Sequence, residues 1–301
     1  MEKTLLSISG PTGIGKTSWA IGLARHFRTE ILSSDSRQFY REMRIGTAVP
    51  DASELRAAPH HFIGHRSIHQ PYSVGDFQYD ALALLRTLFS KHDILILVGG
   101  SGLYTDAVTQ GLDAFPPVAE GVREALMARY EANGLEGLQA ELQQRDPDYY
   151  REVDLQNPHR VIRALEVCLS SGKPFSSFRG KSTPPDFFRH IPLGVTGPRE
   201  VIYHRIEARV DAMMEAGLLE EARGLFPYRH LPALQTVGYQ ELFGYMEGKW
   251  DLETAINEIK KNTRRYAKRQ LTWLRKSGDI LWIEYDAPLE EGISEVEIAL
   301  K

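Results

Sequence analysis

Four short apolar runs, separated by longer amphipathic stretches, organise the chain. They lie at residues 4–10 (TLLSISG), 30–34 (EILSS), 94–98 (ILILV) and 191–197 (IPLGVTG). The run at 94–98 is unbroken and rich in β-branched residues, which is typical of a central parallel strand covered on both faces. Strands that alternate with helices predict right-handed βαβ units and a doubly wound α/β fold, with ligands at the carboxyl ends of the strands.

The pattern becomes helical in the middle of the chain, from about residue 113. The clearest helix there should begin at Asn157 and Pro158, a favourable cap and first-turn pair, and end near Gly172. A loop rich in glycine and proline follows. We therefore expect a P-loop NTPase-like core made of residues 1–112 and 189–301, with a parallel sheet flanked by helices, and an inserted all-helical subdomain at 113–188.

Two long helices are expected after the sheet resumes, at 198–217 and 251–278. In the second, Leu252, Ile256, Ile259 and Tyr266 recur at helical spacing, so the lysines and arginines from residue 260 onward are expected on the opposite side.

Composition narrows the functional classes. With 301 residues, 42% of them hydrophobic and 25% charged, the chain is not intrinsically disordered and has room for about two domains. No apolar run approaches the ~18 residues that cross a bilayer, so we expect a cytoplasmic protein without a membrane partner. The single cysteine, Cys168, excludes an internal disulfide and a cysteine-based zinc site.

Charge is distributed unevenly along the chain. The net charge is -4, yet residues 260–276 contain only basic charges and no Asp or Glu. This run predicts a local basic face of the kind that binds nucleic acid, although a merely solvated surface has the same composition.

Residues 10–17 (GPTGIGKT) match the phosphate-binding pattern GxxxxGK[ST] and lie between a predicted strand and a predicted helix. The motif predicts a site for a diphosphate or triphosphate, with Lys16 as a positive charge and the Thr17 hydroxyl as a ligand for Mg²⁺. The loop residues that would bind the phosphates are Gly10, Pro11, Thr12, Gly13, Ile14 and Gly15. The strand ending at Val98 runs into two glycines without a carboxylate, which disfavours nucleotide hydrolysis as the main activity.

Two polar residues should reach the same edge of the sheet. Asp35 follows the second predicted strand, and Ser101 follows the third. Asp35 could be a general base, a magnesium ligand through water, or a local cap of its own turn.

Several blocks together resemble one family, the tRNA dimethylallyltransferases, also called tRNA isopentenyltransferases. The blocks run in order along nearly the whole chain: DSRQFY (35–40), IGTAVP (45–50), PHH (59–61), LVGGSGLY (97–104), NPHRVIRALE (157–166), VGYQE (237–241) and AKRQLTWLR (267–275). The resemblance implies transfer of a dimethylallyl group from dimethylallyl diphosphate to N6 of adenosine 37, next to the anticodon of tRNA. The partner is then the anticodon stem-loop of tRNA. Mg²⁺ is the cofactor expected from Thr17 of the phosphate-binding loop, and we expect a monomer, since no oligomer is required.

The resemblance assigns roles to the residues of the site. Asp35 would accept the proton of the adenine amine, and Lys16 with Thr17-bound magnesium would stabilise the leaving diphosphate. Ser36 and Gln38 would hold the adenine, Ser101 would lie beside the amine, and Arg209 would bind diphosphate unless it is an ordinary exposed arginine. The remaining expected tRNA contacts are Arg37, Arg123, His159, Arg160, Arg163, Gln235, Gly238, Tyr239, Lys268, Arg269, Gln270, Trp273 and Arg275. Core packing is the alternative for Trp273.

Three alternatives to tRNA prenylation stay open: a P-loop kinase of a small molecule, an isopentenyltransferase acting on AMP, ADP or ATP, and an RNA-binding module with a vestigial P-loop.

Four histidines, His60, His61, His65 and His69, suggest a metal site. Pro59, Gly64 and Pro71 interrupt any helix that would align them, so we do not expect one, and their role stays open. Val49 and Ala222 depart from the residues common in the family, lysine and valine.

Overall fold

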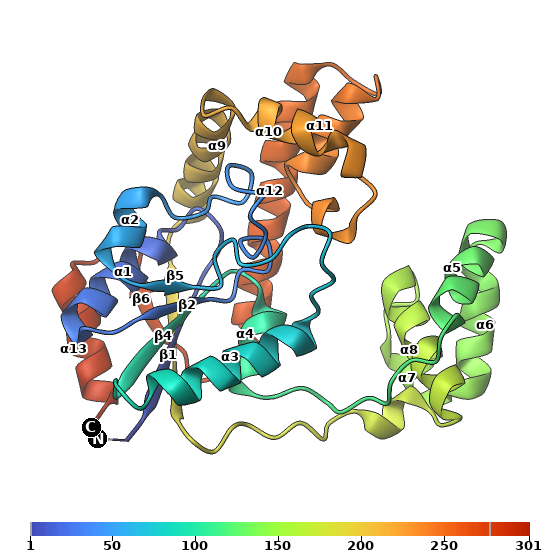
Figure 1. The fold of residues 1–301 in the computed structure, drawn as a ribbon, viewed down its shortest axis with the longest axis horizontal. Coiled ribbons are helices and arrows are strands. Elements are labelled where there is room, and N and C mark those ends of the chain that lie inside the picture. Colours follow the sequence, from blue (N-terminus) through green and yellow to red (C-terminus); the bar gives the residue numbers. More distant parts are fainter. Residues whose placement is uncertain (1, 277) are drawn as a thin grey trace. The chain divides into compact units, whose positions relative to one another are not determined.

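The computed structural model describes residues 2–276 and 278–301. Within these residues, parallel strands form one sheet in the order β3-β2-β4-β1-β5-β6 (Figure 1). The strands are β1 Thr4–Ser9, β2 Ile31–Ser33, β3 His60–His61, β4 Ile94–Val98, β5 Arg189–Thr196 and β6 Leu281–Glu284. The predicted P-loop NTPase-like α/β class and its four predicted strands are confirmed. Strands β3 and β6 were not predicted, because one is only two residues long and the other is a half-exposed strand at the edge of the sheet.

Alternation along the central strands places apolar side chains on both faces of the sheet. In β4, Leu95 and Leu97 point into the hydrophobic cluster that contains helix α3 (Val74–Leu88). Ile94, Ile96 and Val98 point into the cluster that contains α1 (Lys16–Phe27) and α13 (Leu289–Ala299). Burial on both faces explains why the sequence of β4 is apolar at every position.

The other helices that belong to the same part of the chain as the sheet follow its strands in sequence. They are α2 Ala52–Ala57, α4 Gly102–Thr109, α9 Arg199–Glu215, α10 Leu218–Leu225, α11 Tyr239–Met246 and α12 Leu252–Leu274, with 3-10 turns at Phe226–Tyr228 and Pro232–Leu234. Helix α12 ends before the expected residue 278; Ser277, which falls in the expected range, lies outside the described residues. No helix in the described parts of the chain is long and apolar enough to cross a membrane.

The chain divides into two compact units. One contains residues 1–109 and 185–301, and the other contains residues 110–184. These boundaries lie close to the expected insertion at 113–188. The second unit contains α5 Val122–Asn133, α6 Glu136–Arg145, α7 Pro147–Glu152, α8 Pro158–Ser171 and a 3-10 turn at Phe175–Phe178. It has a hydrophobic core of its own, so the all-helical insertion is confirmed.

Helix α8 follows the local signals in its sequence. The Asn157 side chain accepts a hydrogen bond from the backbone N–H of Arg160, and Gly172 ends the helix in the left-handed conformation, with φ of 69°. Between these caps, one face buries Val161, Leu165 and other apolar residues in the core of the unit.

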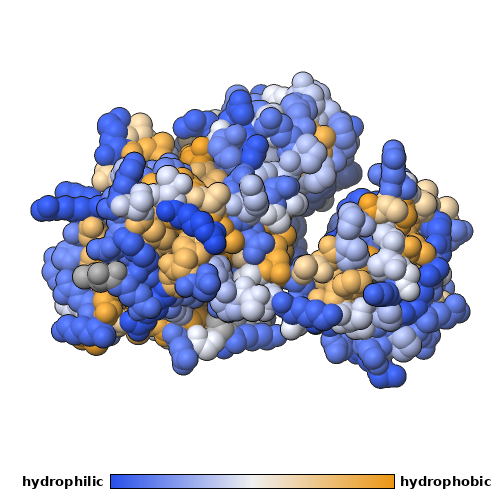
Figure 2. Space-filling model, turned by 60° about the horizontal axis from the view of Figure 1, so that its bottom comes forward, coloured by the Kyte–Doolittle hydropathy of each residue, from blue (hydrophilic) through white to orange (hydrophobic). Residues whose placement is uncertain are grey.

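Hydrophilic residues cover most of the molecular face drawn in Figure 2.

Candidate active site

Three loops meet at the carboxyl edge of the sheet, because each follows one of three adjacent parallel strands. Residues 10–15 follow β1, residues 34–38 follow β2, and residues 99–101 follow β4. A cavity of about 480 Å³ opens there. The expected site residues that line it are Thr12, Gly13, Gly15, Lys16, Thr17, Asp35, Ser36, Arg37, Gln38, Arg209 and Gly238.

The phosphate-binding loop has the backbone that its glycines permit. Gly13 and Gly15 have φ values of 85° and 106°, in the left-handed region that favours glycine. Helix α1 begins directly afterwards at Lys16, so the unpaired N–H groups of its first turn lie next to this loop. Gly10, Pro11 and Ile14 do not line the cavity. Ile14 is fully buried and packs in the core, where it anchors the loop.

Three charged side chains line the cavity: Lys16 and Asp35 are partly buried, and Arg209 on α9 is exposed. Burial lowers the pKa of Lys16 to about 8, partly offset by the negative charge of Asp35. Burial raises the pKa of Asp35, although the backbone N–H of Arg37 donates a hydrogen bond to its carboxylate (3.1 Å) and Lys16 opposes the shift. Arg37 also lines the cavity, as do the carboxylates of Asp51 and Glu54. The cations available to an anionic ligand are therefore Lys16, in the phosphate-binding loop, and Arg209 on α9.

Gln270 holds two of the three loops together. Its side chain is buried, its carbonyl accepts a hydrogen bond from the backbone N–H of Thr12 (2.8 Å), and its amide donates to the carbonyl of Gly100 (2.8 Å). The amide lies where a Cβ on Gly100 would be, so this close contact requires glycine at that position. Gln270 was expected to contact tRNA, but its polar atoms are bonded within the chain and support the site.

Replacing Gln270 by Ala should destabilise the protein. The change leaves the partly buried N–H of Thr12 without its partner, and the carbonyl of Gly100 keeps only a longer hydrogen bond from Tyr266 (3.4 Å). The loss should cost about 1–3 kcal/mol of the free energy of unfolding. Urea denaturation measures it, with Arg269→Ala as the matched control on the same helix. Arg269 is exposed, so its removal should change stability by less than about 0.5 kcal/mol. Equal effects of the two variants would contradict the supporting role of Gln270.

Gln38 fixes the loop on the opposite wall of the cavity. Its amide donates to the carbonyls of Thr47 (3.3 Å) and Ala48 (3.0 Å), and its carbonyl accepts from the hydroxyl of Ser33 (3.1 Å). Ala48 has a φ of 49°, a conformation rare for residues other than glycine, and it lines the cavity. Gln38 therefore stabilises an unfavourable backbone conformation beside the site.

Glu221, which the sequence did not single out, holds the same loop from its other side. Its carboxylate accepts hydrogen bonds from the backbone N–H groups of Arg44 (3.0 Å), Ile45 (2.9 Å) and Gly46 (3.0 Å). The hydroxyl of the fully buried Tyr239 donates to it as well (2.6 Å). Tyr239 was expected to contact tRNA, but its hydroxyl is committed to the wall of the cavity.

Ser101 lies next to the cavity without lining it. Its hydroxyl is 3.3 Å from the hydroxyl of Ser36, which does line the cavity.

Two further residues near the site had no signal in the sequence. Arg205 donates to the carbonyl of Ile14 in the phosphate-binding loop (2.9 Å), and Tyr266 lines the cavity from α12.

The basic run on α12 is partly neutralised. Lys260 pairs with Asp211 (2.6 Å), Lys261 with Glu258 (2.6 Å), and Arg264 with Glu207. The predicted basic face therefore carries less net charge than the sequence indicates, because α9 supplies two acidic partners. Lys268, Arg269 and Arg275 are exposed and, in the described parts of the chain, make no ion pair. Trp273 is half-buried against Gly102.

The expected tRNA contacts in the helical unit differ in their freedom to bind a ligand. Arg123 (2.6 Å) and Arg163 (3.1 Å) both pair with Glu166, whose side chain is buried. His159 and Arg160 are exposed in the first turn of α8. In the other unit, Gln235 is exposed, and its amide donates to the carbonyl of Arg229 (2.6 Å).

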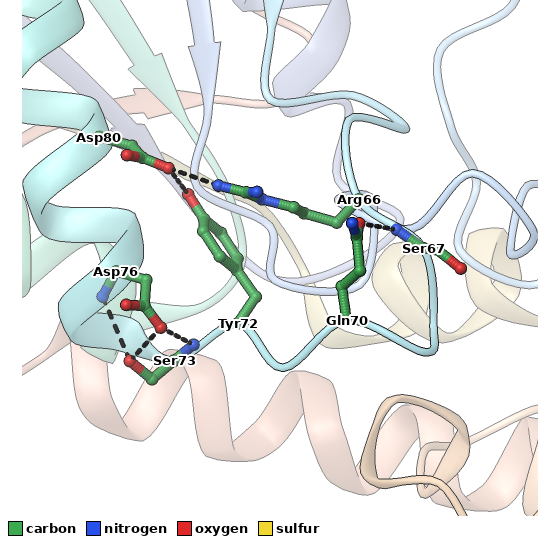
Figure 3. A network of polar contacts seen from close by, with 7 residues as sticks. All are labelled: Arg66, Ser67, Gln70, Tyr72, Ser73, Asp76 and Asp80. Carbon is green, nitrogen blue, oxygen red and sulfur yellow. Dashed lines mark hydrogen bonds and ion pairs between the residues drawn. The ribbon is translucent and has the colours of Figure 1, made fainter.

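The four histidines at 60–69 do not converge. His61 pairs with Glu30 (2.7 Å), His69 packs against Tyr228, and the His65 ring packs among Phe39, Phe62 and Tyr72. Residues near the histidines make polar contacts with helix α3 (Figure 3). Asp80 of α3 accepts hydrogen bonds from Arg66 (2.8 Å) and from the hydroxyl of Tyr72 (2.9 Å), and Ser73 and Asp76 cap the start of the helix. These contacts give the segment a structural role.

Comparisons with known proteins agree with this geometry. The family model described as IPP transferase matches residues 38–277. A tRNA dimethylallyltransferase of Christiangramia forsetii is 57% identical over 286 residues, 95% of each chain, and one of Flavobacterium johnsoniae is 49% identical over 99% of each.

Solved structures of similar proteins give the same result. A tRNA isopentenylpyrophosphate transferase of Bacillus halodurans aligns with a TM-score of 0.73 and 36% identity over 100% of this chain and 96% of that one. A eukaryotic dimethylallyltransferase, described as acting on tRNA, aligns with a TM-score of 0.80 and 26% identity over 94% of this chain and 74% of that one. The chain therefore belongs to the tRNA dimethylallyltransferases, a family of prenyl-transferring enzymes.

Proposed function

We propose that this chain transfers the dimethylallyl group of dimethylallyl diphosphate to N6 of adenosine 37, next to the anticodon of tRNA, and releases diphosphate. One observation carries the proposal: a phosphate-binding loop and the partly buried carboxylate of Asp35 line the same cavity. The names of the relatives support the choice of substrates.

The phosphate-binding loop and its cations would hold the donor. The N–H groups at the start of α1, with Lys16 and Arg209, provide positive charge where the diphosphate would bind. Negative charge grows on the bridging oxygen as the allylic C–O bond breaks. Fixed positive groups at that point stabilise the transition state more than the bound donor, which is the condition for catalysis.

The residues present fit a magnesium ion that binds together with the donor. Mg²⁺ takes few protein oxygens and completes its coordination with water and substrate phosphates. Thr17 offers a hydroxyl in the cavity, and Asp35 lines the same cavity and could act through a bound water. The described residues contain no cluster of acidic, histidine or cysteine side chains able to hold a metal alone, so the ion would depend on the donor's phosphates. When bound, it would neutralise charge on the leaving group.

Asp35 would act on the acceptor. The exocyclic amine of adenine is a weak nucleophile because its lone pair is delocalised into the ring. As N6 forms a bond to the first carbon of the dimethylallyl group, the C–O bond to diphosphate breaks and the amine loses a proton to the Asp35 carboxylate. Burial raises the pKa of Asp35, which makes its carboxylate a better proton acceptor.

Binding of tRNA would use residues of the cavity wall for the adenine and residues on the surface for the rest of the RNA. Ser36, Arg37, Gln38 and Ser101 would surround the flipped adenine at the sheet edge. Lys268, Arg269 and Arg275 would contact phosphates, and Trp273 would offer an aromatic face beside Gly102. In the helical unit, His159 and Arg160 are the exposed candidates, with Arg123 and Arg163 tied to Glu166.

A label-transfer assay tests the proposal. Purified protein is incubated with Mg²⁺ and radiolabelled dimethylallyl diphosphate, and unmodified tRNA, AMP or ATP is offered separately. We expect label in tRNA only. Label in AMP or ATP alone would assign the acceptor to free nucleotides, and transfer of phosphate from labelled ATP to a small molecule, without prenyl transfer, would support the kinase alternative.

The two shifted pKa values predict a bell-shaped pH dependence of kcat/KM for the donor. Activity should rise as Asp35 loses its proton, at a pH above the usual aspartate range because burial raises its pKa. It should fall above about pH 8, where Lys16 loses its proton. In Lys16→Arg, whatever activity remains should lack the alkaline fall, because arginine stays protonated. A fall that persists in this variant would show that another group causes it.

A further inference from the structure

The cavity changes in character along helix α9. At one end Ile206 packs against Gly13 of the phosphate-binding loop. Arg209 lines the cavity about one turn farther along, and Met213 lines it about one turn beyond that. Because an α-helix rises about 1.5 Å per residue, Met213 lies roughly 10 Å past Ile206 along the axis. Helix α9 therefore extends from the charged end of the cavity to an end distant from the phosphates.

Apolar side chains line part of the cavity, and several of them are well packed. These apolar residues belong to one hydrophobic cluster: Val210, Met213, Leu218, Val237 and Ile259. They come from α9, α10, α12 and the segment before α11, which lie together in Figure 1. Leu218 is 0% exposed and Ile259 only 2% exposed, so the wall is part of the protein core and cannot move back freely.

Two features keep these apolar residues in place. Gly217, with φ of 98°, turns the chain from α9 into α10, where Leu218 begins the helix. Three residues after Leu218, the Glu221 carboxylate accepts hydrogen bonds from the backbone N–H groups of the loop at 44–46 (2.9–3.0 Å). The apolar part of the wall is thus fixed, and it lines the same cavity as the phosphate-binding loop.

We propose that Met213 sets the length of the prenyl chain that the enzyme accepts, admitting dimethylallyl and excluding geranyl, which is one isoprene unit longer. The inference rests on the proposed function and adds to it the residue that selects the donor. With the diphosphate held at the phosphate-binding loop, the prenyl tail points along α9 toward Met213. The longer geranyl tail would overlap the Met213 side chain. The packed residues behind Met213 leave no space for the extra isoprene unit.

Shortening Met213 is the direct test. Met213→Ala removes the three outermost side-chain atoms and leaves room for part of a second isoprene unit. The side chain is only partly buried, and alanine is the best helix former, so the variant should fold. Met214→Ala is the matched control, because Met214 is also partly buried against the same cluster but does not line the cavity.

The experiment measures kcat/KM for dimethylallyl diphosphate and for geranyl diphosphate, with the same unmodified tRNA as acceptor. Wild type and Met214→Ala should both favour dimethylallyl diphosphate to a similar degree. In Met213→Ala, kcat/KM for geranyl diphosphate should rise by about tenfold or more, while that for dimethylallyl diphosphate falls, since pocket contacts of this size change discrimination by about 10–200-fold.

An unchanged ratio of the two kcat/KM values in Met213→Ala would overturn the proposal, and so would an equal shift in Met214→Ala. Should Met213→Ala not fold, Met213→Phe gives a second test: a larger side chain should raise KM for dimethylallyl diphosphate several-fold, and an unchanged KM would count against the proposal. A wild-type enzyme that transfers no dimethylallyl to tRNA contradicts the proposed function itself, which separates the two failures.

Discussion

Asp35→Asn should lower the single-turnover rate of dimethylallyl transfer by about 10²- to 10⁴-fold, the usual contribution of a positioned general base. Asparagine has the same shape but cannot accept the proton of the adenine amine. Asp35 is partly buried, and desolvation raises its pKa, so a neutral group in its place removes an unfavourable charge and the variant should fold and bind tRNA. Quenched-flow measurement with preformed enzyme–tRNA complex isolates this step.

The matched control for Asp35 is Asp51→Asn. Asp51 lines the same cavity but is exposed at the N-cap of α2, where asparagine is an equally good cap. Its replacement should leave the rate close to that of wild type. A wild-type rate in Asp35→Asn would remove the carboxylate from the reaction, and an equal loss in both variants would show that the overall charge of the cavity matters and the position does not.

Lys16→Met should lower kcat/KM for dimethylallyl diphosphate by about 10²- to 10³-fold, the cost of removing one group that stabilises charge in a transition state. The ammonium lies in the phosphate-binding loop, where its Nζ donates to the carbonyl of Pro11 (3.0 Å) and is available to a bound diphosphate. Inorganic diphosphate should also inhibit the variant less strongly than wild type. Steady-state kinetics with tRNA held at saturation measures both effects.

A loss of folding does not explain the expected effect of Lys16→Met. The pKa of Lys16 is lowered to about 8, so its charged form is less favourable in the folded than in the unfolded chain. Removing that charge should leave the midpoint of thermal unfolding unchanged or higher. A variant that unfolds at lower temperature, or one with unchanged kcat/KM, would contradict the role assigned to Lys16.

Local patterns in the sequence predicted the parts of the site that lie next to one another along the chain. The glycines of the phosphate-binding loop and the position of Asp35 after a buried strand were sufficient, because parallel strands bring their carboxyl ends to one edge. Strands β1, β2, β4 and β5 and the helical insertion followed from the hydrophobic pattern in the same way.

Contacts between distant segments could not be predicted. Gln270 bonds to Thr12 and Gly100, and Glu221 bonds to the loop at 44–46, across long stretches of chain with no shared pattern. Both residues therefore support the cavity. The sequence analysis had expected Gln270 to contact tRNA, and it had not singled out Glu221. The ion pairs that neutralise part of the α12 charge were not predictable for the same reason, since Glu207 and Asp211 lie on α9.

The most direct test is a crystal structure of the enzyme with a non-reactive analogue of dimethylallyl diphosphate and an unmodified anticodon stem-loop. We expect the diphosphate on the loop at residues 10–17 and adenine N6 within about 2.6–3.2 Å of the Asp35 carboxylate, the distance for direct proton transfer. An adenine bound elsewhere, with Asp35 facing away from N6, would contradict the proposed reaction.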